Sequence, residues 1–146
     1  MTADESAVEA DVRERIASDP FCATLGIDLV DLGPASARTE LAVTDELLNF
    51  HGTPHGGAVY SLADAAFAAA SNARGDVALA LETNISYLDS ADVGATLVAT
   101  AEETHASGRT AEYEVVVTED AGDRSENRGD DDAARIATFR GRVYRP

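Results

Sequence analysis

Hydrophobic residues recur along this chain at two spacings, one typical of helices and one typical of strands. From Val8 to Ile16, a valine or isoleucine occupies every fourth position with charged residues between, which predicts a short amphipathic helix over residues 4–18 of an N-terminal segment, 1–19. The Asp19–Pro20 pair is expected to end this helix, because a residue that precedes proline disfavours the helical conformation.

A longer helix is predicted over residues 56–72, where nearly all side chains are small and apolar. A helix this apolar must be covered by protein on nearly every side. Gly75 is expected to mark its end, because glycine readily adopts the left-handed conformation that often follows a helix.

The other hydrophobic runs are short and bounded by turn residues, as β-strands are. Gly33–Pro34 predicts one turn, and Gly108 supplies the glycine that a hairpin needs. The order helix, two strands, long helix, four strands predicts a single α+β domain over residues 1–146, with a curved antiparallel sheet wrapped around the long helix. The predicted strands cover residues 27–32, 35–43, 77–88, 95–104, 110–118 and 136–144.

Residues 119–133 interrupt the last two predicted strands with seven acidic residues, two arginines and no apolar residue larger than alanine. Such a segment cannot bury enough apolar surface to order itself, so it is predicted to be an exposed, mobile acidic loop. A functional acidic tail is the alternative interpretation, and no function is assigned to the loop.

The excess of acidic residues excludes some classes of binding partner. With 27 acidic and 11 basic residues, the formal net charge is -16. A surface this acidic repels nucleic acid and anionic membranes, so neither is expected as a partner. All the basic residues are arginine, and a lysine-free acidic surface resembles that of proteins adapted to high salt, in which ions screen the self-repulsion.

The sequence features are those of a cytoplasmic protein. A single cysteine, Cys22, excludes an intramolecular disulfide and suits a reducing compartment. The acidic N-terminal residues do not resemble a signal peptide, and no run of about 18 apolar residues predicts a membrane span.

Asp64 is the only carboxylate in the long apolar helix, where its neighbours one turn away include Tyr60 and Phe67. Desolvation in such surroundings would raise the pKa of the carboxylate, which suits a group that handles protons. The alternative is that Asp64 only marks the exposed face of the helix, beside Ser61 and Asn72.

Gly56 and Gly57 open the same helix, whose first turn has backbone N–H groups without intrahelical partners. Glycines let a substrate approach these groups, which can then hold a developing oxyanion, as acyl transfer requires. The alternative for the glycine pair is a plain turn. His55 either donates to the same oxygen or is a buried structural residue.

The spacing of these groups has a consequence for assembly. Gly57 and Asp64 are seven residues apart, or about 10 Å along a helix axis, whereas groups that serve one reaction lie about 3 Å from the reacting centre. A second copy of the helix, packed antiparallel, would bring Asp64 of one subunit near Gly57 of the other. If both residues are catalytic, the enzyme is expected to be at least a two-fold homodimer with shared sites.

Other chemistries are weakly supported. His51 and His55 have the spacing of a helical zinc pair, but the glycine and proline between them argue against a helix there. Ser61 with a histidine and Asp64 has the residue types of a hydrolase triad without the nucleophile-elbow context. No P-loop or dinucleotide fingerprint is present. Neither a metal nor an organic cofactor is expected.

The stretch LNFHGTPHGGAVYSLADAAFAAASN, residues 48–72, resembles the PaaI-like acyl-CoA thioesterases of the phenylacetate pathway, which have the hotdog fold. Their signature is an asparagine, six residues later an HGG, and then a helix that contains S-L-A-D. Asn49, His55 and the residues that follow match at these spacings. The Y-L-x-x-A-x-x-G turn, the H-x-x-G-R/K-T hairpin and the closing TFRGRVYR are also similar, so the resemblance covers roughly residues 20–146.

The resemblance implies a thioester hydrolase with a site shared between subunits. Gly57 would polarise the thioester carbonyl through its N–H, and Asp64 of the neighbouring subunit would be the nucleophile or general base. Asn49 and His55 would position the thioester or the attacking water, with Gly56 and Ser61 of the same motif beside the substrate. Homodimers, often paired into homotetramers, are expected from the family.

One position departs from the family pattern, and several other residues have more than one possible role. Where some relatives have a serine or threonine that holds the water, this chain has Ala80, and Thr83 is the candidate substitute. Arg74 and Arg109 are candidate partners for coenzyme A phosphates. Aromatic residues of the motif region would line either an acyl pocket or the core. These residues are Phe50, Tyr60 and Phe67.

The acyl group is not specified, although an aryl-acetyl or hydroxyphenylacetyl ester fits the resemblance. The alternative function is a non-catalytic acyl-CoA-binding protein on the same fold, because fold alone does not establish activity. Hydratases of this fold share a D-x-N-x-x-H pattern, which is absent from this sequence.

Overall fold

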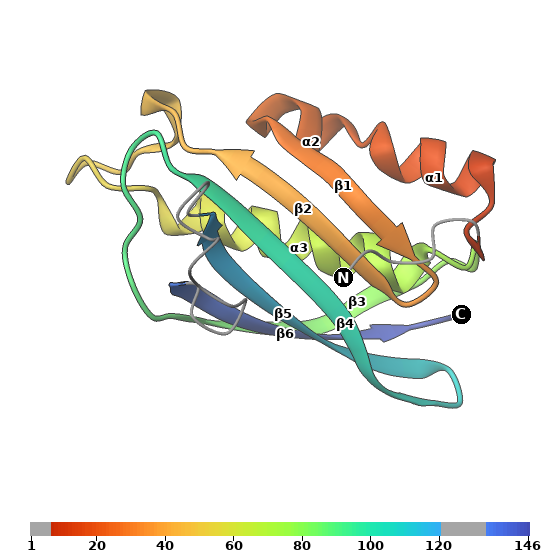
Figure 1. The fold of residues 1–146 in the computed structure, drawn as a ribbon. Coiled ribbons are helices and arrows are strands. Elements are labelled where there is room, and N and C mark those ends of the chain that lie inside the picture. The colour runs from red at the N-terminus through yellow and green to blue at the C-terminus, as the bar shows by residue number, and fades with distance from the viewer. Residues whose placement is uncertain (1–6, 121–133) are drawn as a thin grey trace, which may run out of the picture.

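The computed structural model describes residues 7–120 and 134–146, and shows a curved antiparallel sheet wrapped around one long helix (Figure 1). The six strands have the order β1-β2-β4-β5-β6-β3, so β1 and β3 form the two edges. The α+β arrangement predicted from the sequence is confirmed. The elements are α1 (Ala10–Ala17), α2 (Pro20–Leu25), β1 (Ile27–Gly33), β2 (Ser36–Ala42), the 3-10 turn η2 (Asp45–Leu47), α3 (Gly56–Asn72), β3 (Leu79–Tyr87), β4 (Thr96–Ser107), β5 (Thr110–Asp120) and β6 (Arg135–Tyr144).

Helix α1 starts later than predicted, at Ala10, and ends at Ala17, just before the Asp19–Pro20 pair that is expected to stop it. The same pair also starts a second helix, α2, which the sequence does not predict. The carboxylate of Asp19 accepts the backbone N–H of Cys22 at 3.0 Å and thereby caps α2. Proline suits the first helical position, where its missing N–H has no helical role. The helix ends at Gly26, whose φ of 82° is the left-handed conformation that glycine readily adopts.

All six predicted strands are present, and the hairpin between β4 and β5 is longer than predicted. The pairing of the two strands continues to Ser107 and Thr110, with Gly108 at a φ of 60° in the turn. Strand β5 extends through Asp120, so the first two residues of the predicted acidic loop are in the sheet. The rest of that loop, residues 121–133, lies outside the described residues.

Helix α3 has the bounds that the sequence predicts, and it forms the centre of the core. The side chains of Leu62 and Ala66 are completely buried, and the many alanines let the strands approach the helix closely. The closest approach is at Gly141 of β6, where an added Cβ would lie 2.6 Å from ring atoms of Phe67. The sheet can curve around α3 at this point because the strand has no side chain there.

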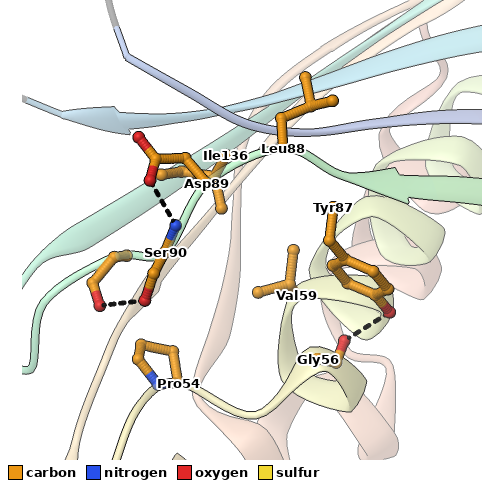
Figure 2. A pocket seen from close by; sticks show the side chains of 9 residues that line it. Pro54, Gly56, Val59, Tyr87, Leu88, Asp89, Ser90 and Ile136 are labelled. Carbon is orange, nitrogen blue, oxygen red and sulfur yellow. Dashed lines mark hydrogen bonds between the residues drawn. The ribbon is translucent and has the colours of Figure 1, made fainter.

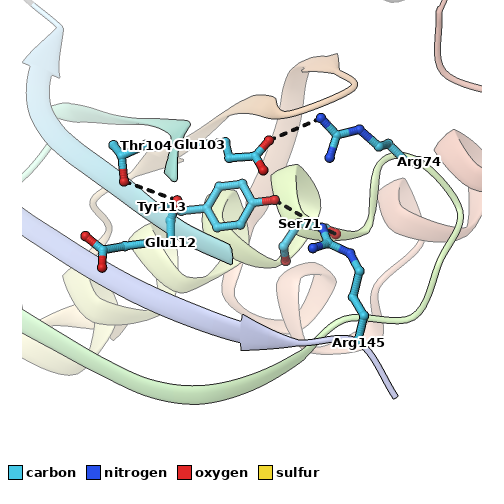
Figure 3. Close-up of polar contacts among 7 residues, drawn as sticks. All are labelled: Ser71, Arg74, Glu103, Thr104, Glu112, Tyr113 and Arg145. Carbon is cyan, nitrogen blue, oxygen red and sulfur yellow. Dashed lines mark hydrogen bonds and ion pairs between the residues drawn. The ribbon is translucent and has the colours of Figure 1, made fainter. Parts of the chain in front are cut away.

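The C-terminal end of α3 is fixed by two arginines (Figure 3). Arg145 donates through Nη2 to the carbonyl oxygen of Ser71 at 3.1 Å and to the hydroxyl of Tyr113 at 3.2 Å. Arg74 forms an ion pair with Glu103 at 3.1 Å. A cation at this end of a helix is favourable because the last carbonyl groups carry partial negative charge.

Among the described residues, none of the helices is long and apolar enough to cross a membrane.

Candidate active site

The first turn of α3 is capped by the residue that precedes it. The Nδ1 atom of His55 accepts the backbone N–H of Gly57 at 2.8 Å. Of the two alternatives for His55, the buried structural residue is wrong, because its side chain is exposed. Donation to a substrate oxygen stays a prediction, and here the ring acts as the acceptor for the Gly57 N–H. His55 accepts this bond because a side-chain acceptor at the start of a helix satisfies a backbone N–H that has no partner within the helix.

Asn49 organises the loop that leads into α3. Its Oδ1 atom accepts the backbone N–H of His51 at 2.9 Å and that of Thr53 at 3.2 Å, and its Nδ2 donates to the Thr53 hydroxyl at 3.0 Å. The backbone N–H of His55 donates to the carbonyl oxygen of Leu47 at 2.8 Å and closes the loop. Asn49 thus fixes the approach of His55 to the helix start.

Gly57, Ser61 and Asp64 lie on one face of α3, because they follow each other at intervals of four and three residues. The hydroxyl of Ser61 donates to the carbonyl oxygen of Gly57 at 2.8 Å and so belongs to the helix start. Asp64 lies on the same face but about 10 Å further along the axis. Within one subunit, the structure therefore does not bring the carboxylate and the Gly57 N–H together.

Asp64 is half-buried, and burial raises the pKa of its carboxyl above the ordinary value. The negative charge of Asp19, at the start of α2, raises it further. The pKa of the Cys22 thiol is raised to about 11 by burial and by the charges of Asp19 and Asp64. Asp19, at the start of α2, is therefore near enough for its charge to act on Asp64. Such a carboxyl group can hold a proton or take one from water nearer to neutral pH.

Two cavities border the N-terminal end of α3. One, of about 330 Å³, is bordered by Pro54, Gly56 and the end of β3 (Figure 2). There the hydroxyl of Tyr87 donates to the carbonyl oxygen of Gly56 at 3.0 Å. Burial and the neighbouring Tyr60 raise the pKa of the Tyr87 phenol.

The other cavity, of about 230 Å³, lies between α2 and the first turns of α3. Gly57, Ser61 and His55 border it from α3, and Phe21 and Leu25 border it from α2. Of the two cavities, it is the one bordered by Gly57, the candidate oxyanion donor. The α2 residues of this cavity are not predicted from the sequence. The Asp-Pro pair could have indicated helix α2, because an acceptor followed by proline is also a usual start of a capped helix.

The remaining predicted residues lie away from Asp64 or are engaged elsewhere. The hydroxyl of Thr83 shares a hydrogen bond of 2.6 Å with that of Tyr60, and Ala80 is exposed on β3. Phe67 belongs to the core, whereas Phe50 is 93% exposed. The predicted aromatic pocket is therefore not formed by these residues.

The candidate phosphate-binding arginines both have partners. Arg74 is paired with Glu103, and Arg109 donates to the hydroxyl of Tyr144 at 3.3 Å. Arg74 lies at the opposite end of α3 from Gly57, about 25 Å away along the axis. Within the described ranges, no group of three or more histidine, cysteine or acidic side chains could hold a metal ion.

Comparisons with known proteins identify the family and the fold of this chain. The family model of the thioesterase superfamily matches residues 51–125. The acyl-coenzyme A thioesterase PaaI of Escherichia coli is 33% identical over 128 residues, which cover 88% of this chain and 84% of that protein. A protein of Archaeoglobus fulgidus is 36% identical over 88% of this chain and 76% of its own length.

The solved structure of a mutant of the phenylacetic acid degradation protein PaaI from Thermus thermophilus has the same fold. It is 38% identical, with a TM-score of 0.77 over 88% of this chain and all of that chain. This chain belongs to the thioesterase superfamily, and it is a thioester hydrolase with the hotdog fold.

Proposed function

We propose that this protein hydrolyses an acyl-coenzyme A thioester to a free acid and coenzyme A. The observation that carries the proposal is the half-buried Asp64 carboxylate on the same face of α3 as the Gly57 N–H. The N–H would polarise the thioester carbonyl and stabilise the oxyanion, while Asp64 would activate water or attack the carbonyl itself. The E. coli relative is named an acyl-coenzyme A thioesterase, which supports coenzyme A esters as the substrate class.

The two groups serve one carbonyl only if they come from two subunits. Strand β3 supports a homodimer, because it is an edge strand that presents apolar side chains to solvent. Leu79 and Leu81 are 54% and 53% exposed, and Val77 before them is 58% exposed. The opposite edge, β1, instead has a bulge and acidic side chains, which discourage pairing. Pairing of two dimers would then give the homotetramer.

His55 has to release Gly57 before the oxyanion site can work. Because the His55 side chain is exposed, it can rotate without disturbing the core. The Gly57 N–H would then donate to the thioester carbonyl, and the imidazole would lie beside it. Asn49 would act through the loop by holding His55 in reach.

The reaction needs no metal or organic cofactor, because a carboxylate, a water molecule and a backbone donor suffice for hydrolysis. Phenylacetyl esters are the first candidates for the acyl group, since two relatives bear the name PaaI. Phosphate groups of coenzyme A would compete with Glu103 for Arg74, or with Tyr144 for Arg109.

The test is thiol release from phenylacetyl-, hexanoyl- and acetyl-coenzyme A by the full chain. Asp64→Asn is expected to lower kcat by roughly 100-fold or more, because acid–base catalysis contributes at least this much. Asp76→Asn, which removes an exposed carboxylate just after α3, is the matched control and should leave kcat unchanged. Near-normal turnover by Asp64→Asn would overturn the assignment. Tight binding of the esters without thiol release by the wild type would support the acyl-CoA-binding alternative.

A further inference from the structure

We infer that the cavity between α2 and α3 holds the acyl group of the thioester, and that Phe21 and Leu25 of α2 select which acyl groups fit. This inference rests on the proposed function. The position of the cavity supports it, because Gly57 borders the same space. A thioester whose carbonyl accepts the Gly57 N–H would have its acyl substituent next to this opening.

The size of the cavity suits an acyl group and not a whole coenzyme A molecule. Its volume of about 230 Å³ is below the range of roughly 300–1,000 Å³ that holds drug-sized ligands. The larger cavity beside Tyr87 is bordered by Gly56 and Asp89 but not by Gly57. It is therefore the poorer candidate for the acyl end of the substrate.

The lining points to a neutral, apolar occupant. Five of its side chains are apolar, whereas its one carboxylate, Glu46, would repel an acyl group that ends in a second carboxylate. No lysine or arginine borders the cavity to neutralise such a group. The apolar members are Phe21, Leu25, Leu47, Leu48 and Ala58.

Hydrogen bonds to the backbone fix both walls of the cavity without a ligand. On one side, Asp19 caps the start of α2, and the N–H of Gly26 donates to the Cys22 carbonyl at its end. On the other side, the bond from His55 to the Leu47 carbonyl fixes the leucines. A preformed wall lowers the ordering cost of binding.

Phe21 offers an apolar surface that an occupant of the cavity would cover. Its side chain is 59% exposed although it borders a cavity lined by leucines. An acyl chain or an aryl ring in the cavity would cover this ring and gain the hydrophobic contact that water does not give.

The test compares kcat/KM for a set of esters. The selectivity ratio is kcat/KM for phenylacetyl- or hexanoyl-coenzyme A divided by kcat/KM for acetyl-coenzyme A. Phe21→Ala is expected to lower this ratio by roughly tenfold or more. Leu25→Trp, which fills the cavity, should lower the same ratio. Glu46→Gln should raise the relative rate with succinyl-coenzyme A. The matched control is Phe50→Ala, which removes a ring that is 93% exposed and outside the cavity, and it should leave the ratio unchanged.

The outcomes separate this inference from the proposed function. If the wild type hydrolyses these esters and neither Phe21→Ala nor Leu25→Trp changes the ratio by more than about twofold, the inference is overturned. It is also overturned if Phe21→Ala changes only the oligomeric mass, because the ring is then a subunit contact. If the wild type releases no thiol at all, the proposed function fails. In that case, calorimetry measures the affinity for hexanoyl-coenzyme A. A weaker affinity of Phe21→Ala would still support binding of the acyl group in this cavity, and an unchanged affinity would overturn the inference.

Discussion

The imidazole of His55 accepts the backbone N–H of Gly57 at 2.8 Å, so the helix start that would bind an oxyanion already has an acceptor of its own. The bond is an N-cap, and it should stabilise the fold. We expect His55→Ala to lower the free energy of unfolding by about 0.5–2 kcal/mol, the usual value of a cap. Urea denaturation measures the change, and His55→Asn should recover most of it because asparagine is a strong N-cap. Equal stability of the alanine variant and the wild type would contradict this role.

The raised pKa of Asp64 predicts the pH dependence of the reaction. If the carboxylate is the base, activity falls as the pH falls through the pKa of Asp64, which lies above the ordinary value. Asp19 contributes to that rise through its charge, so Asp19→Ser should lower this pKa and move the acid limb of kcat/KM to lower pH. Serine keeps the cap of α2, which makes the variant a test of charge alone. An unmoved acid limb would show that Asp19 does not influence the base.

Sharing of the site between subunits predicts complementation. Asp64→Asn and Gly57→Val should each be inactive as homodimers, because each spoils both sites. A mixed dimer has one intact site, which takes Asp64 from one chain and Gly57 from the other. Equal mixing after unfolding and refolding should therefore give about one quarter of the wild-type activity per subunit. Sites built within one chain would give none, and sedimentation of the mixture confirms that dimers have formed.

Gly141 predicts a large effect of one methyl group on stability. An added Cβ would lie 2.6 Å from the ring of Phe67, which is buried between α3 and the sheet. Since the ring has no room to move, Gly141→Ala should lower the free energy of unfolding by about 1–3 kcal/mol in urea denaturation. Arg140→Ala, one residue earlier and exposed, removes only a 3.7 Å surface ion pair and should cost far less.

The acidic composition predicts stabilisation by salt. Raising KCl from about 0.1 M to about 1 M shortens the Debye length from about 10 Å to about 3 Å and screens the repulsion of a net charge of -16. The melting temperature should rise by several degrees at pH 7. Near the isoelectric point of about 4.3 the same salt step should have little effect, because the net charge there is close to zero. An equal rise at both pH values would point to a cause other than charge screening.

The predictable parts of the fold are those that local sequence determines. Helix α3 was predicted over its observed bounds, since a glycine pair and an alanine-rich run leave few other conformations. The strands followed from alternation, although the ends of the β4–β5 hairpin depend on pairing and not on composition. Helix α2 is not predicted, because the Asp19–Pro20 pair that follows the end of α1 also starts the next helix.

The candidate site was only partly predictable. The types and spacing of Gly57 and Asp64 are visible in the sequence, as is the distance that separates them along the helix. The acceptor role of His55 is not, because it depends on the rotamer of one ring. The proximity of Asp19 to Asp64, and of Phe21 to Gly57, arises only when α2 folds back toward α3.

The contact of Arg145 with the Ser71 carbonyl has a consequence for the order in which the protein assembles. The two residues are 74 positions apart, and Arg145 follows the last strand, so this contact can form only after all six strands have left the ribosome. The bond between His55 and Gly57 spans two residues and can form as soon as the helix starts. During synthesis, the capped start of α3 can thus form early, whereas the contact of Arg145 with the other end of the helix must wait until synthesis passes β6.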